Sequence, residues 1–195
     1  MIIGLTGKYC AGKNYVAALL EKRGFPALDV DKLGYEALEM EKETIFTRFG
    51  KDLQRLDGSL DRQLLGQRVF GKPEKLAELE TIIHPPVNRM VEEWLKNTNS
   101  SSGYHVINAA LLHRAEVFAR LDCLILVTAP FLTRLLRAKR RDRLPLSEIL
   151  KRFASQKNFY SQYLSINAEI YKVENPGFIK LENRIERIIK NIRGE

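Results

Sequence analysis

Residues 2–15 read Ile2-Ile3-Gly4-Leu5-Thr6-Gly7-Lys8-Tyr9-Cys10-Ala11-Gly12-Lys13-Asn14-Tyr15, and this stretch decides the fold. A short apolar run stops at Gly7, and Gly12-Lys13 follows at the spacing that lets a strand turn sharply around a phosphate and enter a helix. Glycines adopt backbone angles that other residues avoid, so successive N–H groups can converge on a phosphate oxygen. The stretch therefore predicts a phosphate-binding loop, and a Gly-rich turn with an exposed lysine is the alternative.

Two residues at the end of this loop carry its chemistry. Lys13 is expected to reach the β- and γ-phosphates of a nucleotide, and the N-terminus of a helix over residues 13–23 adds partial positive charge. The pattern requires Ser or Thr after the lysine to place a hydroxyl on Mg²⁺, whereas this chain has Asn14. An amide oxygen binds hard cations but is harder to fit into the tight octahedron of Mg²⁺. Asn14 is therefore both the candidate metal ligand and the departure that weakens the case for a metal.

Length and composition bound the class of protein. The 195 residues have room for one substantial core or for a core with an insertion, and 45% are hydrophobic, as in a globular chain. Two cysteines are too few for a disulfide framework, and no signal sequence or long apolar span is visible. These features predict a cytoplasmic protein without a membrane partner, and they do not indicate an oligomeric state.

The net charge of +8 favours an anionic partner, but charge alone does not separate nucleic acids from nucleotides. The densest basic run is 134–143, and it lacks the interleaved aromatic residues of a base-stacking platform. We therefore expect a small phosphorylated ligand and no nucleic acid. A solvated helix face is the alternative explanation of the basic run.

A second strand is expected over residues 25–28, and it ends in Asp29-Val30-Asp31. Ligands in open α/β sheets bind at the carboxyl ends of strands, so an acid here can face a phosphate held after the first strand. Asp31 is the candidate catalytic residue, and capping of the helix predicted over 32–43 is its alternative role.

Residues from about 32 to 95 show helical periodicity without a clear strand and are interpreted as a helical insertion. Arg62 could hold a substrate phosphate with its planar guanidinium, or it could pair with a surface acid. His84 precedes Pro85-Pro86, and a His before a helix-starting proline favours a structural role.

Further strands alternate with helices along the remaining chain. Strands are expected over 104–109, 123–128 and 170–173, and an amphipathic helix over 178–192 closes the chain. Together with the first two, these strands predict an α/β fold with a five-stranded parallel sheet and right-handed crossovers.

The basic run is expected to form a helical hairpin. A helix over 130–141 is broken at 144–147 and followed by a helix over 148–157. Arg137 and Arg141 are four residues apart and share a helix face. A hairpin carrying arginines can close over a triphosphate, exclude water and stabilise transition-state charge.

These elements together resemble the dephospho-CoA kinase family over nearly the whole chain. The matching residues are Gly4-Leu5-Thr6-Gly7 with Gly12-Lys13, Asp29-Val30-Asp31, Phe49-Gly50, Asp57 to Arg62, Ile83-His84-Pro85, Leu111-Leu112, Arg137, Arg141-Asp142, Gln156, and Ala168 through Asn175 to Gly177. The resemblance implies a P-loop kinase with a nucleotide-binding core (1–31 and 104–195), a helical substrate-binding domain (32–103) and a lid near 138–150. It also implies transfer of the γ-phosphoryl group of ATP to the ribose 3′-hydroxyl of dephospho-coenzyme A.

The resemblance also implies roles for single residues. Asp31 matches the proposed general base, Lys13 matches the catalytic lysine, and Arg137 and Arg141 match the lid. The residues that would hold ATP are Gly7, Cys10, Ala11, Gly12, Lys13, Asn14 and Tyr15, and those that would contact substrate are Thr6, Asp31, Arg62 and His84. One acid oriented on the attacking hydroxyl, a loop lysine, lid arginines and Mg²⁺ suit phosphoryl transfer, which depends on positioning and charge cancellation.

Three departures keep other functions open. Asn14 replaces a hydroxyl residue, Lys8 stands where the family usually has a glycine, and residues 110–114 read Ala-Leu-Leu-His-Arg instead of Pro-Leu-Leu-Phe-Glu. The two other hypotheses are a related kinase for another small acceptor, and a catalytically silent protein that binds a nucleotide or nucleic acid.

Overall fold

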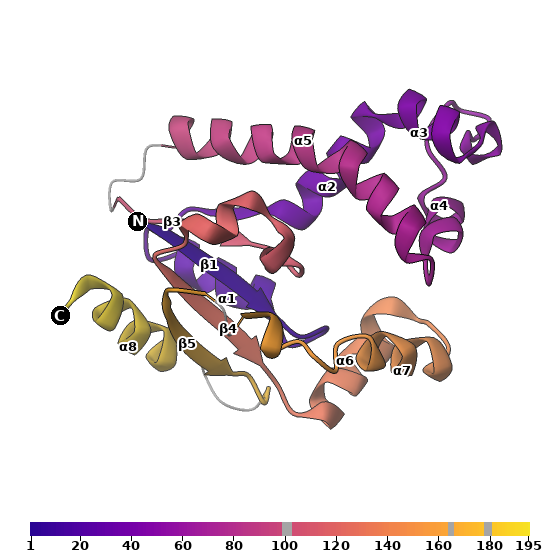
Figure 1. Cartoon of the computed structure of the whole chain (residues 1–195). Coiled ribbons are helices and arrows are strands. Elements are labelled where there is room, and N and C mark those ends of the chain that lie inside the picture. The colour runs from indigo at the N-terminus through magenta and orange to yellow at the C-terminus, as the bar shows by residue number, and fades with distance from the viewer. Residues whose placement is uncertain (99–102, 164–165, 178–180) are drawn as a thin grey trace. The chain divides into compact units, whose positions relative to one another are not determined.

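Figure 1 shows a computed structural model of the chain, which describes residues 1–98, 103–163, 166–177 and 181–195. The chain divides into two compact units. The first, called here the core unit, comprises Met1–Leu28 and Thr98–Glu195, and the second, the helical unit, comprises Asp29–Asn97. Asp31 belongs to the helical unit, because a helix begins at Val30, directly after the second strand.

The core unit is built on the expected five-stranded parallel sheet. Its strands are β1 (Ile2–Gly7), β2 (Ala27–Asp29), β3 (His105–Asn108), β4 (Cys123–Thr128) and β5 (Glu169–Glu174), in the order β2-β3-β1-β4-β5. In the register of the sheet, Leu5 of β1 lies beside Asn108 of β3, and Gly7 lies beside Val127 of β4. β1 is central and buried from Ile3 to Gly7, which explains why its sequence is an unbroken run without alternation.

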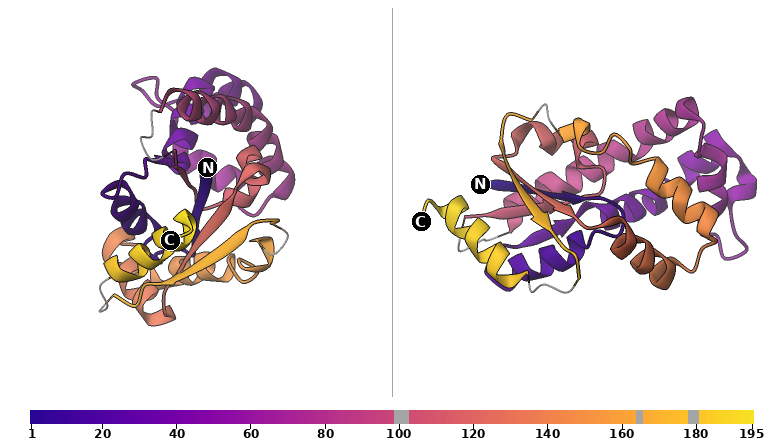
Figure 2. Two further views of the ribbon diagram at one scale, coloured as in Figure 1. Left: turned by 90° about the vertical axis from the view of Figure 1, so that its left-hand side faces the viewer. Right: turned by 90° about the horizontal axis from the view of Figure 1, so that it is seen from below.

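Helices α1 (Lys13–Glu21) and α8 (Glu182–Arg193) pack on one face of this sheet (Figures 1 and 2). Figure 2 shows them in indigo and yellow on the same side of the strands. The other face at Gly4 is covered by 3-10 turns η2 (Leu112–Arg114) and η3 (Glu116–Arg120) and by the residue after them. A Cβ added to Gly4 would lie 2.6 Å from Leu121 Cδ1 and 2.8 Å from Leu112 Cδ2, so a larger residue there would have to displace these leucine side chains.

The basic run forms the helical hairpin expected from the sequence. Its helices are α6 (Phe131–Asp142) and α7 (Leu146–Ala154), and the chain then passes through η4 (Ser161–Tyr163) into β5. Pro130 and Pro145 each occupy the N-cap position of a helix. Proline suits a helix start because the first helical N–H groups have no partner within the helix. Of the helix expected over 178–192, residues 178–180 lie outside the described part of the chain.

The helical unit consists of α2 (Val30–Met40), α3 (Lys42–Phe49), η1 (Lys51–Leu53), α4 (Arg62–Val69) and α5 (Pro73–Asn97). Its own apolar cluster is built from α3, η1, α4 and α5, with Ile45 and Leu53 fully buried. Residues 30–97 are all described and contain no strand, only an isolated bridge between Gln54 and Leu60. The segment interpreted as a helical insertion from its periodicity is therefore helical, and its role as a substrate-binding domain stays a prediction.

One helix boundary predicted from the sequence is wrong. Pro85 does not start a helix, because α5 runs without a break from Pro73 to Asn97, and His84 lies in its interior. A proline inside a helix removes a backbone hydrogen bond and is unfavourable in isolation. Here Pro86 and Val87 are buried, so tertiary packing of α5 offsets the local cost.

Candidate functional site

The phosphate loop occupies the turn from β1 to α1, at the carboxyl edge of the sheet. Gly12 has φ 96°, in the left-handed region, and a Cβ there would lie 2.4 Å from Asn175 Nδ2. Both the backbone angle and the space therefore require glycine. The Ala11 N–H donates to Lys8 O at 2.8 Å, which closes the turn ahead of the helix.

Cys10 is a non-glycine residue in the left-handed region, with φ 59°. Such angles are unfavourable for a side chain that carries a Cβ, and they are found chiefly where the surrounding structure imposes them. The Cys10 side chain is half-buried, and burial raises the pKa of its thiol. The thiol therefore stays protonated at neutral pH and is a poor nucleophile.

Lys13 and Asn14 meet a buried amide from the neighbouring strand. Lys13 Nζ donates to Asn108 Oδ1 at 2.9 Å and to Asn14 Oδ1 at 3.2 Å. Asn108 Nδ2 also donates to Asn14 Oδ1, at 3.2 Å. Asn108 ends β3 and is only 2% exposed, so it orients the lysine from a rigid position. The predicted phosphate-contacting lysine is thus held at the start of α1 by two side-chain oxygens.

The same contacts bear on Mg²⁺, which the fold family implies. Asn14 Oδ1 already accepts hydrogen bonds from Lys13 and Asn108. Among the described residues, no group of three or more His, Cys, Asp or Glu side chains could hold a metal ion. Mg²⁺ prefers carboxylate, hydroxyl and phosphate oxygens in a strict octahedron. The donor set around Asn14 therefore does not fit a magnesium site supplied by the protein.

Arg137 of α6 braces the loop from the other side. Its Nη1 donates to Ala11 O at 3.1 Å and to Cys10 O at 3.4 Å, and its Nη2 donates to Asn175 Oδ1 at 3.1 Å. Asn175 follows β5, is 6% exposed and donates from Nδ2 to Ala11 O at 2.9 Å. The guanidinium therefore reaches the loop as expected, and in this structure it binds loop carbonyls.

Tyr9 ties the first half of the loop to both helices of the hairpin. Its N–H donates to Gln156 Oε1 at 2.7 Å, and its hydroxyl donates to Asp142 Oδ2. The guanidinium carbons of Arg141 and Arg152 lie 5.2 Å and 5.6 Å from the centroid of its ring. Burial, followed by the bond to Asp142, raises the pKa of Tyr9, so the phenol remains a hydrogen-bond donor at neutral pH.

Arg141 is paired with an acid of the same helix. Its Nε donates to Asp142 Oδ1 at 2.6 Å, and its Nη2 donates to Oδ2 at 3.1 Å. This bond is the main cause that lowers the pKa of Asp142 and raises that of Arg141. The side chain of Arg141 is 60% exposed, so the pair is accessible to a competing anion.

Thr6 is buried beneath the loop. Its exposed fraction is 0%, and its Oγ1 lies 3.2 Å from the Tyr163 hydroxyl and donates to Ala110 O at 3.4 Å. His113 Nδ1 lies 3.3 Å from the same Tyr163 hydroxyl. The Thr6 hydroxyl, which the resemblance assigns to substrate binding, is used here inside the core unit.

In the helical unit, Asp29 and Asp31 have different roles from those expected at a strand end. Asp29 is the N-cap of α2, and its Oδ1 accepts from the Asp31 N–H at 3.1 Å. Asp31 lies in the first helical turn and is exposed. The capping alternative for Asp31 is therefore wrong, because Asp29 is the cap of α2. Asp31 offers an exposed carboxylate at the positive end of a helix.

Arg62 stacks on an aromatic ring. Its guanidinium carbon lies 4.9 Å from the centroid of Tyr35, and both side chains are exposed. The neighbouring Asp61 caps α4 and pairs with Arg55 at 3.4 Å. Surface pairing, the alternative for Arg62, is not seen among the described residues, and the planar donor face of Arg62 remains exposed.

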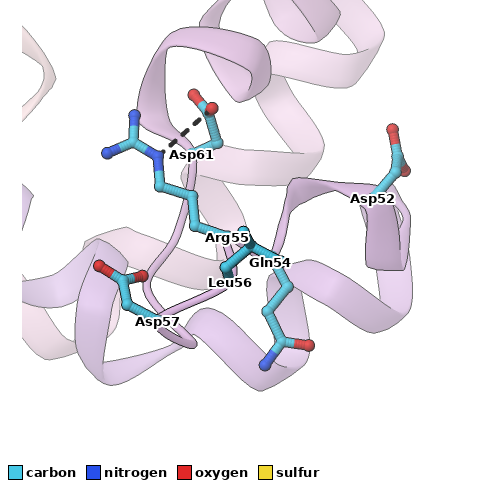
Figure 3. Close-up of a pocket in the computed structure, with 6 residues that line it drawn as sticks. All are labelled: Asp52, Gln54, Arg55, Leu56, Asp57 and Asp61. Carbon is cyan, nitrogen blue, oxygen red and sulfur yellow. Dashed lines mark ion pairs between the residues drawn. The ribbon is translucent and has the colours of Figure 1, made fainter.

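An open pocket of about 520 Å³ lies in the helical unit (Figure 3). It is lined by Asp52, Gln54, Arg55, Leu56, Asp57 and Asp61. Figure 3 shows Arg55 directed at Asp61, the ion pair described above. The only arginine of the lining is paired with Asp61, and Asp52 is paired with Arg68 outside it, so no lining side chain offers an unpaired positive charge to a phosphorylated substrate.

Sequence reasoning assigned no role in the site to three residues that hold the loop: Tyr9, Asn108 and Asn175, the last of which appears only among the residues that match the family. Asn108 and Asn175 occupy equivalent places, at the carboxyl ends of β3 and β5. The rule that ligands bind at the carboxyl ends of parallel strands could have identified both. Tyr9 had no comparable signal in the sequence.

Comparison with known proteins agrees with this geometry. The family model for dephospho-CoA kinase matches residues 1–169. The dephospho-CoA kinase of Treponema pallidum is 32% identical over 100% of this chain and 97% of its own length. The crystal structure of the protein TT1252 from Thermus thermophilus is 33% identical, with a TM-score of 0.82 over 100% of this chain and 96% of that one.

A more distant structure confirms the fold class. Shikimate kinase from Bacteroides thetaiotaomicron is 13% identical, with a TM-score of 0.52 over 100% of this chain and 99% of that one, and it shares the fold alone. The core is therefore a P-loop kinase fold. No helix among the described residues has the length and apolar character to span a bilayer. The chain belongs to the dephospho-CoA kinase family.

Proposed function

We propose that the chain transfers the γ-phosphoryl group of ATP to the ribose 3′-hydroxyl of dephospho-coenzyme A, giving coenzyme A and ADP. Membership of the kinase family supports the reaction class. The observation that carries the proposal is Lys13, held at the start of α1 by Asn108 Oδ1 at 2.9 Å behind a closed glycine turn. This arrangement aims an ammonium group and the N–H groups of a helix terminus at one place, where phosphates bind.

On the donor side, loop residues Gly7 and Cys10 to Tyr15 would hold the phosphates of ATP. Lys13 would offset the charge that develops on the transferred group. Arg137 supports the loop through its carbonyls, and Arg141 has an exposed guanidinium that a phosphate can recruit from Asp142. The contribution of these groups is positioning and electrostatic stabilisation, since phosphoryl transfer requires little covalent help.

On the acceptor side, we assign Asp31 as the general base that accepts the proton of the attacking 3′-hydroxyl. Its exposed carboxylate in the first turn of α2 suits that role. Arg62, stacked on Tyr35, would bind a phosphate of dephospho-coenzyme A with its planar donors. His84 and Thr6 belong to the same proposal, although the Thr6 hydroxyl would have to leave its bond to Ala110 O.

Bound with the nucleotide, Mg²⁺ supplies charge neutralisation at the phosphate oxygens in kinases of this fold. The side chains around Asn14 do not fit as its ligands, because Asn14 Oδ1 is already bonded to Lys13 and Asn108. The proposed roles of Lys13, Arg137 and Asp31 are independent of a metal ligand at position 14.

The test is release of ADP in the presence of dephospho-coenzyme A as sole acceptor, compared with a panel of nucleoside monophosphates. Wild-type protein should turn over dephospho-coenzyme A, and Lys13→Ala should not. Lys22→Ala, an exposed lysine after α1, is the matched control and should retain activity. Turnover of another acceptor only would reassign the substrate within the kinase class.

The hydrogen bonds of Asn14 favour one other function, a nucleotide-binding relative without turnover. If the lysine and amides are locked together, the loop can bind ATP without catalysing transfer. ATP binding measured by calorimetry, combined with no ADP release across a range of metal ions, would establish this second function.

A further inference from the structure

The hairpin helix α6 buries an arginine and exposes leucines. Its two buried residues are Arg134 and Ala138, whereas Leu132 and Leu136 are 69% and 58% exposed. Burial of arginine at a core position is rare unless the charge is paired. Arg134 is also three and seven residues before Arg137 and Arg141, so the three arginines share the face that meets the phosphate loop. In α6 the charged side chain of Arg134 therefore occupies a buried position that usually holds an apolar residue.

Arg134 has no anionic partner among the described residues. Its exposed fraction is 9%, and its Nε atom is buried without a hydrogen-bond partner. The contact recorded for its guanidinium is with the ring of Phe153, 4.7 Å from its centroid. Phe153 in turn packs edge-on against Tyr9 of the loop, with centroids 5.6 Å apart. Arg134 thus lies one aromatic ring away from the phosphate loop.

Lys8 of the loop is a second cation that has no anionic partner among the described residues. Its Nζ lies 4.4 Å from the ring centroid of Tyr160, and no ion pair to it occurs among the described residues. Burial, and then the charge of Arg134, lower the pKa of Lys8. Burial also lowers the pKa of Arg134. Lys8 directly precedes Tyr9, whose ring packs on the Phe153 ring that Arg134 contacts, so aromatic contacts connect the two cations.

The other cations of the site differ, since each already has oxygen partners. Arg137 binds the carbonyls of Cys10 and Ala11, Arg141 binds Asp142, and Lys13 binds Asn108. A desolvated cation without an anion is unfavourable, and an arriving anion with oxygen acceptors supplies the missing hydrogen bonds. A multiply charged phosphate group satisfies two such cations at once.

We propose that Lys8 and Arg134 form an additional phosphate-binding subsite beside the loop, occupied by a phosphate group of the bound nucleoside triphosphate. The inference deepens the proposed function and rests on it for the identity of the ligand. The diphosphate of dephospho-coenzyme A has the same chemistry, so the test must separate the two sources. Position 8 itself belongs to the loop that follows β1, which favours the nucleotide.

The probes are inorganic tripolyphosphate, ATP and dephospho-coenzyme A, each titrated calorimetrically into the full chain in metal-free buffer. Arg134→Met should weaken binding of tripolyphosphate and ATP by about tenfold or more, because a charge-assisted hydrogen bond to a desolvated anion is lost. Arg140→Met is the matched control, an exposed arginine of the same helix, and should leave both affinities within about twofold. Dephospho-coenzyme A binding should change little in either variant.

Lys8→Met provides a second variant in case Arg134→Met does not fold, since Lys8 lies on a partly exposed loop. It should also weaken tripolyphosphate binding, and the double variant should lose less than the sum of the two losses if one phosphate contacts both residues. Unchanged tripolyphosphate affinity in folded Lys8→Met or Arg134→Met would overturn the subsite. A loss confined to dephospho-coenzyme A would overturn its assignment to the nucleotide.

These outcomes are distinct from failure of the proposed function. Tripolyphosphate binding requires neither an acceptor nor phosphoryl transfer. If dephospho-coenzyme A is not phosphorylated but Arg134→Met still weakens tripolyphosphate binding, the subsite is supported and the proposed reaction is refuted. If the reaction occurs and Arg134→Met alters only the stability of the fold, Arg134 is a packing residue and the subsite is refuted.

Discussion

The two halves of the phosphate loop are held by different kinds of contact. The second half, Ala11 to Asn14, is bonded chiefly to buried amides at the carboxyl ends of two strands: Asn175 donates to Ala11 O, and Asn108 accepts from Lys13. The first half, Lys8 to Cys10, is bonded to the helical hairpin through Tyr9, by Asp142, Gln156 and the arginines around its ring. One half is anchored to the sheet and the other to charged groups that a phosphate can also bind.

The difference teaches which part of the site is preformed. Neutral amide contacts from buried strands change little with salt or pH, and they fix Lys13 before a ligand arrives. The contacts of the hairpin involve carboxylate and guanidinium groups, whose pairing depends on protonation and on competing anions. We infer that the sheet side positions the nucleotide and that the hairpin side responds to it.

The largest effect is expected on the sheet side, from Lys13→Ala. Loss of the ammonium should lower kcat/KM for ATP by about 10²–10³-fold, the range seen when one preorganised charge-stabilising group is removed. Stability to urea should fall by about 1–3 kcal/mol, because the buried Asn108 Oδ1 loses its donor while Asn108 Nδ2 keeps its bond to Asn14. Steady-state kinetics with Lys22→Ala as control would show this, and a loss below tenfold would mean that Lys13 is not the main phosphate contact.

Asn175→Ala tests whether the sheet side is a structural anchor. Removal of this amide takes one of two donors from Ala11 O and leaves Arg137 Nη2 without its acceptor, which should cost about 1–3 kcal/mol of the free energy of unfolding. Urea denaturation measures the loss. Asn183→Ala, an exposed asparagine on α8, serves as control and should be neutral within about 0.5 kcal/mol. Equal stability of both variants would contradict the anchoring role.

The hairpin side should show pH dependence through Asp142. Its pKa is lower in the folded chain than in the unfolded one, so the stabilisation is present above the ordinary carboxyl pKa and is lost as pH falls through the lowered value. Asp142→Asn should cost about 1 kcal/mol at neutral pH and reduce the decline in stability between about pH 5 and pH 2. Urea denaturation as a function of pH, with Glu148→Gln as surface control, measures both. If the stability of Asp142→Asn and of wild type declined in parallel as the pH falls, the hairpin contacts would not depend on protonation, and the two halves of the loop would not differ in this respect.

The smallest effect is expected at Asn14, the candidate Mg²⁺ ligand at the end of the loop. The Asn14 amide oxygen already accepts hydrogen bonds from Lys13 and Asn108. In Asn14→Ser this oxygen is replaced by the short hydroxyl of serine, which suits Mg²⁺. The Mg²⁺ concentration needed for half-maximal ATP binding and turnover should fall by severalfold, on the order of 1 kcal/mol or less. An unchanged metal requirement would show that position 14 does not determine metal use.

Much of the fold could be predicted from local pattern. Buried parallel strands leave continuous apolar runs, which is why β1 and β4 are clear in the sequence, and Pro130 marks the start of α6. The sequence predicts a break at 144–147, whereas Pro145 is the N-cap of α7, which begins at Leu146. Errors arose where tertiary packing overrides a local signal. Pro85 and Pro86 lie inside α5, which the packing of its buried face holds together.

Site residues could be predicted only where a residue type in a known spacing indicates its chemical role. Lys13 follows from the glycine spacing, but the partners of the loop depend on which strand ends lie side by side in the sheet. Asn108 and Asn175 are far apart in the chain, and neither the strand predicted over 104–109 nor the turn around Asn175 indicates that they meet the loop. The burial of Arg134 is a further case, because nothing local predicts that an arginine takes the inward face of α6 while Leu132 is exposed.

The most direct test of the central claim is identification of the product formed from ATP and dephospho-coenzyme A. Mass spectrometry should show the addition of one phosphoryl group, and ³¹P NMR should show a new monoester on the ribose 3′-oxygen, with both signals absent for Lys13→Ala. Two results would contradict the account. One is recovery of unmodified dephospho-coenzyme A after incubation with folded protein that binds ATP, and the other is phosphorylation at any other position.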